Sequence, residues 1–196
     1  DPRTRAIVDD ARAFLKRPGP TCDLIVFGTL DAHLGFYSSV ASSIRLDNYV
    51  YTVEAFRGAL SRLRPTGAVY AYVYIERPWV ASRLAAVIEE AWGRPPLTRP
   101  LSEVRDGAAF LFGPGALAVA EESGMRAGLP AGDRLLHPPG PLATDDWPFL
   151  YLRSRSVPTV LLVSALLVLL AAAILSRRLL GGTFARSRHF FLLGTG

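Results

Sequence analysis

The sequence predicts an α/β domain that leads directly into a transmembrane helix. Segments with strand-like and helix-like patterns alternate up to residue 123, which is typical of a mainly parallel sheet with helices on both faces. Residues 157–175 then contain no charged side chain, and as a helix they would be roughly 28 Å long, close to the thickness of the bilayer hydrocarbon. A chain of 196 residues accommodates one such domain and its anchor.

The strand-like segments are short apolar runs rich in β-branched and aromatic residues. They comprise residues 23–27, 68–75 and 108–112. The first is almost continuous in such residues, as expected for a strand that is covered on both faces. The sequence Arg64-Pro65-Thr66-Gly67 predicts a turn before the second.

The helix-like segments begin at capping residues or prolines. Helices are predicted over residues 11–16, 53–63, 78–92 and 115–123. Thr52 is the expected N-cap of the second helix, and Pro78 suits the first turn of the third. Residues 93–100 and 125–144 are rich in glycine and proline and are predicted to be irregular connections.

The excess positive charge lies beside the apolar C-terminal segment. The formal net charge is +5, and beyond residue 156 there are four of the 22 basic residues and none of the 17 acidic ones. These four are Arg177, Arg178, Arg186 and Arg188. Arginines that flank apolar sequence indicate membrane topology, so no nucleic-acid partner is expected.

The predicted organisation has five parts. They are a domain over residues 1–150, a juxtamembrane linker over 151–156, a transmembrane helix over 157–176, a basic loop over 177–188 and the start of a second transmembrane helix over 189–196. The last run is too short to span a bilayer, so a multi-pass protein that continues beyond Gly196 is expected. Taken alone, the arginines of the loop place that loop in the cytoplasm and the domain outside.

Three stretches within residues 1–150 carry a resemblance to a known family. They are VDDARAFL at 8–15, CDLIVFGTLD at 22–31, and YVYTVEAF at 49–56 with the turn and strand LRPTGA at 63–68. They resemble the spermidine synthase-like branch of the class I methyltransferase-like fold, in bacterial proteins that embed this domain among transmembrane helices. TDDWP at 144–148 is similar to a segment common in those proteins. The resemblance implies a partial Rossmann-like sheet, with two strands and a glycine-rich loop expected before Asp1.

The same resemblance implies a site for an adenosyl ligand, either S-adenosylmethionine or its decarboxylated form. Asp10 matches the aspartate that contacts the adenine amino group, and Ala11 supplies a backbone group beside it. Aminopropyltransferases place two aspartates three residues apart after the next strand. Here Gly28 replaces the first, which accepts the proton of the amine, and Asp31 matches the second.

Aminopropyl transfer requires a carboxylate or a tyrosine within hydrogen-bond reach of the attacking amine. Asp31 and Tyr49 are the residues assigned to catalysis, and the other local candidates are Tyr37, Asp47 and Tyr51. Asp31 serves equally well as a turn cap, and His33 is either a base or a solvated loop residue.

Several other polar groups can be explained by a structural role. Asp145 and Asp146 beside Trp147 form either a site or a cap with a packing patch, and alternate tyrosines from Tyr70 suit core packing. Cys22 is expected to be a reduced core thiol. Without a cluster of cysteine and histidine at metal-ligand spacing, no metal is predicted.

The expected function is that of a transferase at the bacterial inner membrane, with an adenosyl ligand, an unknown acceptor and membrane lipid as partners and homo-oligomers allowed. The alternatives are an S-adenosylmethionine-dependent methyltransferase, which Gly28 suits, and a catalytically inactive ligand-sensing or scaffold domain of a transporter-like protein. An acidic, tyrosine-lined pocket would favour polyamines, whereas an apolar pocket would favour a lipid or quinone-like acceptor. The cytosolic supply of adenosyl ligands predicts a cytoplasmic domain, against the arginines of the loop.

Overall fold

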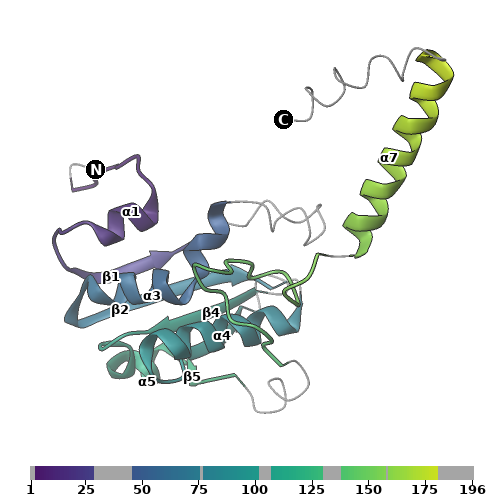
Figure 1. Ribbon diagram of the computed structural model, residues 1–196. Coiled ribbons are helices and arrows are strands. Elements are labelled where there is room, and N and C mark those ends of the chain that lie inside the picture. The colour runs from purple at the N-terminus through teal and green to yellow at the C-terminus, as the bar shows by residue number, and fades with distance from the viewer. Residues whose placement is uncertain are drawn as a thin grey trace. The chain divides into compact units, whose positions relative to one another are not determined.

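The computed structural model describes residues 3–28, 46–75, 77–101, 107–129, 138–157 and 159–180 (Figure 1). The chain divides into two units, residues 1–155 and 156–196. The first unit is a mixed α/β domain with a five-stranded sheet, as the sequence predicts at the level of fold class.

The strands lie in the order β1-β2-β4-β3-β5. Their bounds are Cys22–Phe27 for β1, Leu63–Tyr74 for β2, Leu97–Leu101 for β3, Gly107–Phe112 for β4 and Arg126–Ala127 for β5. Only β1 and β2 pair in parallel, whereas the other three pairs are antiparallel. The prediction of a mainly parallel sheet is therefore wrong for the described strands. Residues 102–106 between β3 and β4 are too few for a parallel crossover, so these strands form a hairpin.

Three of the four predicted helices are confirmed as regular helices. The helical segments are α1 (Ala11–Lys16), η1 (Leu46–Tyr51), α3 (Val53–Ser61), α4 (Pro78–Trp92), η2 (Ala116–Val119) and α5 (Ala120–Ser123). Thr52 caps α3 as predicted, because its side chain accepts a hydrogen bond from Ala55 N at 3.2 Å. Pro78 lies in the first turn of α4, and Gly93 ends that helix at a φ of 83°. The predicted fourth helix is a 3-10 turn followed by a single α-helical turn.

Two segments that were predicted as turn or connection are strands. β2 begins at Leu63, so the predicted turn at residues 64–67 lies within it, where the pairing of β1 with β2 shifts register. β3 occupies the end of the predicted connection over residues 93–100 and includes Pro100. β5 pairs with Leu97 and Thr98 only, so Pro100 lies beyond that ladder, where its missing N–H costs no hydrogen bond.

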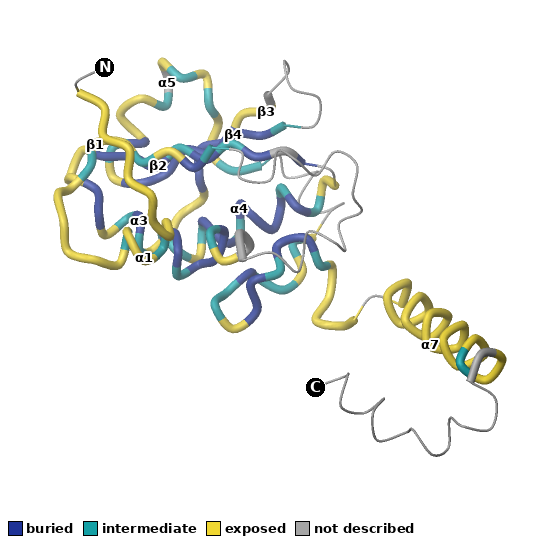
Figure 2. The backbone as a smooth tube through the Cα atoms, turned by 90° about the horizontal axis from the view of Figure 1, so that it is seen from above, coloured by how far each residue is buried: buried dark blue, intermediate teal, exposed yellow. Residues whose placement is uncertain are grey.

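The main core lies between the sheet and the pair α3 and α4, which cover one face (Figure 1). Three aromatic rings join the layers: Phe27 of β1 and Phe112 of β4 both meet Phe56 of α3 edge to face, with centroids 5.4 and 5.3 Å apart. Figure 2 shows most of the buried residues in β2, β4, α3 and α4, whereas the chain before α1 is exposed.

The opposite face is only partly covered in the part of the chain that the structure describes. The segment η2 packs on it through Ala116, against Ala68 and Leu111. Toward β1 the same face carries Leu24 and Val26, each 54% exposed. This half of the sheet therefore presents apolar side chains of an edge strand, next to the half-buried tyrosines of β2.

The second unit contains α7 (Thr159–Leu180). Its residues Thr159–Arg178 form a helix that is long and apolar enough to cross a membrane. The apolar side chains of α7 are exposed (Figure 2), and Ser164 bonds back to Leu161 O at 3.0 Å. The helix starts two residues later than the predicted span at 157 and continues to Leu180, four residues beyond the predicted end at 176. Residues 177–180 of the predicted basic loop are therefore helical. The rest of that loop, residues 181–188, and the apolar run at 189–196 lie outside the described residues.

Candidate functional site

The candidate site is a cavity of about 480 Å³ between α1 and β1. Most of its lining is apolar and comes from both elements and from the chain that precedes α1. The lining residues are Arg5, Ile7, Asp9, Ala11, Phe14, Leu15, Cys22, Leu24, Ile25, Val26, Phe27, Gly28, Val50 and Arg62. The volume suits a small-molecule ligand, and an apolar wall with a few polar groups is typical of such sites.

Of the predicted ligand-binding residues, Ala11 lines this cavity and Asp10 stands next to it in sequence. Asp10 is the N-cap of α1, because its Oδ1 accepts a hydrogen bond from Ala13 N at 2.8 Å. Asp9, which also lines the cavity, forms an ion pair with Arg17 and accepts from Asp10 N at 2.9 Å. The two neighbouring carboxylates therefore organise the start of α1 at the edge of the cavity.

Gly28, the residue that replaces the expected aspartate, lines the cavity at the end of β1. A Cβ added at Gly28 would lie 2.9 Å from the hydroxyl oxygen of Tyr72. Tyr72 belongs to β2, one position beyond the paired residues Phe27 and Ala71, so its hydroxyl occupies the space that an aspartate would need. The sequence pattern predicted that Tyr72 packs in the core and did not predict this contact. The available indication was that glycine replaces the expected aspartate at Gly28 while the following strand carries tyrosines.

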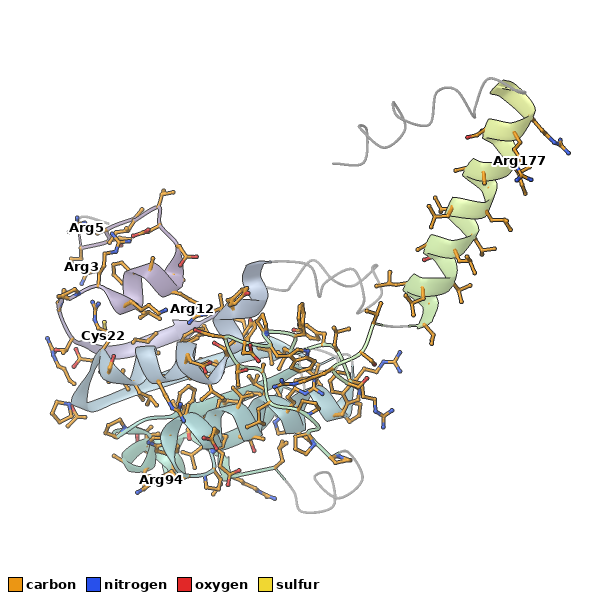
Figure 3. All side chains as sticks on the ribbon, viewed as in Figure 1. Arg3, Arg5, Arg12, Cys22, Arg94 and Arg177 are labelled. Atoms are coloured by element: carbon orange, nitrogen blue, oxygen red, sulfur yellow. The ribbon has the colours of Figure 1, made fainter. Side chains whose placement is uncertain are left out.

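Tyr49, the other described residue assigned to catalysis, belongs to a polar cluster rather than to the lining of the cavity. Its side chain is 37% exposed, and the guanidinium carbon of Arg12 lies 5.8 Å from its ring centroid. Arg12 extends from α1 (Figure 3) and donates to Asp145 Oδ2 at 2.5 Å. Asp145 Oδ1 accepts from Thr52 Oγ1 at 2.9 Å.

This cluster joins α1 and the start of α3 to the last part of the first unit. Besides the contacts of its carboxylate, Asp145 donates its N–H to Glu54 Oε2 at 2.9 Å. The hydrogen bond from Arg12 is the largest of the causes that hold the pKa of Asp145 below its ordinary value, with a smaller contribution from Thr52. The carboxylate of Asp145 accepts from side chains rather than from a backbone N–H, so it forms a tertiary contact and not the predicted cap. The turn that follows is capped by Thr144, whose Oγ1 accepts from Trp147 N at 3.2 Å. Asp146 lies apart, 3.7 Å from Arg155 with its side chain 90% exposed.

At the other end of β1, Arg62 ties the end of α1 to the sheet. Its side chain is 8% exposed and donates to the carbonyl oxygens of Phe14 at 3.2 Å, Arg17 at 2.5 Å and Pro20 at 3.1 Å. Its Nε has no hydrogen-bond partner among the described residues. Cys22 begins β1 (Figure 3); it forms no disulfide and is half-buried, whereas the prediction placed it in the core. The cavity thus has a cationic end.

Several predicted residues lie outside the described part of the chain. They are Asp31, His33 and Tyr37, while Asp47 is described only as a backbone position in η1. Within the described ranges no cluster of histidine, cysteine and carboxylate side chains is arranged to hold a metal ion. No protein-family model and no curated protein matches this sequence.

Proposed function

We propose that this chain is a membrane-anchored transferase that binds an adenosyl-sulfonium ligand in the cavity between α1 and β1, as spermidine synthase-like proteins do. The observation that carries the proposal is that Ala11 and Gly28, from two separate stretches of the resemblance, line one cavity. This cavity reaches the carboxyl end of β1, whose neighbour β2 runs parallel to it, and open α/β sheets bind ligands at such ends.

In this proposal Asp10 and Ala11 hold the adenine. Oδ1 of Asp10 caps α1, so Oδ2 is the atom that we assign to the adenine amino group. The apolar walls from Ile7, Leu24 and Val26 would cover the ring faces. We assign the catalytic roles on the acceptor side to Asp31 and Tyr49. The proposed partners of the protein also include membrane lipid and further copies of this chain.

The charges of the lining favour methyl transfer over aminopropyl transfer as the reaction. Among the described residues, the cavity is lined by two arginines, Arg5 and Arg62, and by one carboxylate, Asp9, which already pairs with Arg17. No tyrosine is among these described lining residues. A polyamine carries several positive charges and would meet a net positive wall, whereas an apolar acceptor would match the remaining surface. The carboxylate of S-adenosylmethionine also suits these arginines better than its decarboxylated form does.

Calorimetric titration of the detergent-solubilised protein with both adenosyl compounds tests the proposal. Preference for S-adenosylmethionine supports methyl transfer, and preference for the decarboxylated compound supports aminopropyl transfer despite Gly28. If neither binds, the domain is a catalytically inactive sensor or scaffold and both enzyme readings are wrong.

A matched pair of variants locates the binding site. Ala11→Leu fills the cavity edge and should weaken binding, whereas Ala13→Leu, on the same helix but outside the lining, should leave binding unchanged. Equal affinities of the two variants would place the ligand elsewhere.

A further inference from the structure

The last part of the domain is attached to α4 by one buried arginine. We call residues 138–155 the strap. Arg83 of α4 is fully buried, and the rings of Trp79 and Trp147 lie 4.6 and 5.3 Å from its guanidinium carbon. Its guanidinium donates to carbonyl oxygens of the strap, namely Pro139 at 2.8 Å, Leu150 at 2.9 Å, Arg153 at 3.1 Å, Phe149 at 3.3 Å and Leu152. The backbone of the strap is therefore fixed up to Arg153.

Two arginines at the end of the strap have side chains available to an external anion. Arg153 is exposed, and its guanidinium has no acidic partner among the described residues. Arg155 is 54% exposed and lies 5.5 Å from the ring of Trp147. Its pairing with Asp146 at 3.7 Å is long and solvent-exposed, and such pairs contribute little.

The covalent connection limits how far these arginines can lie from a membrane that contains α7. Val157, which begins the uncharged segment, is two residues after Arg155 and therefore at most about 7 Å along the chain. The headgroup layer extends roughly 5–8 Å beyond the hydrocarbon on each side. Arg155 is thereby kept at or near the depth of the lipid phosphates. Arg153 is four residues before Val157, at most about 14 Å along the chain, so its long side chain has to extend toward the same layer.

We propose that Arg153 and Arg155 form a binding site for the phosphate of an anionic phospholipid. Guanidinium groups bind phosphate oxygens in a bidentate manner, and the clamp by Arg83 removes much of the ordering cost from the backbone that carries them. A bilayer supplies phosphates at this depth, which is why we assign the site to a lipid and not to free phosphate. The assignment does not depend on the proposed transferase activity.

Photo-crosslinking with the full chain in phosphatidylcholine vesicles tests the site. The probe is a photoreactive phosphatidylglycerol, and adducts are mapped by mass spectrometry. We expect adducts on residues 150–157, reduced by up to about 30-fold in the Arg153→Gln/Arg155→Gln variant, from the interaction of two arginines with an anionic surface. Adducts near Arg177 and Arg178, at the far end of α7 (Figure 3), provide the internal reference because that pair is unchanged.

A second variant should change the adduct yield in the opposite direction. Asp146→Asn removes the carboxylate that competes for Arg155 and should raise the adduct yield on residues 150–157. Because all three substituted side chains are exposed, the unfolding midpoint should not change. An unchanged adduct yield in the double variant would overturn the proposal. So would equal labelling by a photoreactive phosphatidylcholine, or suppression of labelling by inorganic phosphate, which would indicate a site for the free ion.

Discussion

Replacing Arg83 by methionine should destabilise the domain by about 1–5 kcal/mol. Three of its hydrogen bonds lie between 2.8 and 3.1 Å, and each bond from a charged donor contributes about 1.5–3 kcal/mol, which gives at least about 4.5 kcal/mol. Burial offsets part of this sum, because it lowers the pKa of Arg83 to about 10, and each unit corresponds to about 1.4 kcal/mol. The net loss is therefore smaller than the sum of the bonds.

The loss should depend on the shape of the guanidinium and not on charge alone. Arg83→Lys keeps the charge but cannot reach carbonyl oxygens on both sides of the strap, so it should recover less than half of the loss. Arg94, an exposed arginine just beyond α4 (Figure 3), provides the control, and Arg94→Met should change stability by less than about 0.5 kcal/mol.

Guanidinium unfolding of the full chain in detergent measures these differences. Tryptophan fluorescence reports on the region directly, since Trp79 and Trp147 both lie against Arg83. Trypsin cleavage after Arg153 and Arg155 should accelerate in Arg83→Met if the strap is released. The proposed role of Arg83 would be refuted if Arg83→Met were as stable as the parent protein. It would also be refuted if Arg83→Lys had the full stability of the parent.

Three further predictions concern single contacts. Gly28→Ala should cost about 1–3 kcal/mol because its Cβ meets the hydroxyl of Tyr72, and the cost should be smaller in the Gly28→Ala/Tyr72→Ala double variant. Gly58→Ala, which has open space around it in α3, should instead stabilise the domain by about 0.5–1 kcal/mol. Denaturant unfolding of the two single variants and the double variant measures these differences. Thr52→Ala removes the cap of α3 and should cost about 1 kcal/mol in the same assay. Asp145→Asn should destabilise at neutral pH; since the folded-state pKa is depressed, the difference should persist above the ordinary value of 3.8 and vanish as the pH falls through the folded-state value, as a pH series of unfolding midpoints would show.

The helices were predictable because their ends are determined by local chemistry. Thr52 satisfies an N–H at the start of α3, and Pro78 with Gly93 bounds α4, so each signal lies within a few residues of the structure that it determines. The apolar span of α7 is equally local, since its length and lack of charge are read directly from the chain.

Strand direction and pairing were not predictable in the same way. An apolar run such as Gly107–Phe112 has the same composition whether its neighbours run parallel or antiparallel to it. This strand, β4, lies between β2 and β3, and its direction depends on the short connection from β3. The residues of β3 were predicted to belong to an irregular connection because of their prolines. Tertiary pairing therefore overrode the local preference of Pro100.

The candidate site was predictable only where it depends on single residues. Ala11 and Gly28 could be placed from the resemblance, and both line the cavity. The partnership of Arg12 with Asp145 could not be foreseen, because it joins residues that are far apart in the sequence and depends on how the strap returns to α1.

The hydrogen bonds and ion pairs of the described carboxylates limit which residue can accept a proton in the proposed reaction. Asp9 pairs with Arg17, Oδ1 of Asp10 caps α1, and both oxygens of Asp145 accept hydrogen bonds from Arg12 and Thr52. A carboxylate held by a cation is a poor base, because the cation stabilises its ionised form. Beside Gly28, the hydroxyl of Tyr72 occupies the space where the resemblance to spermidine synthase-like proteins implies a carboxylate base. Deprotonation of an amine would therefore depend on Asp31 or Tyr49, the residues proposed for catalysis, and not on these carboxylates, whereas methyl transfer to an acceptor that needs no strong base is compatible with the described groups as they are.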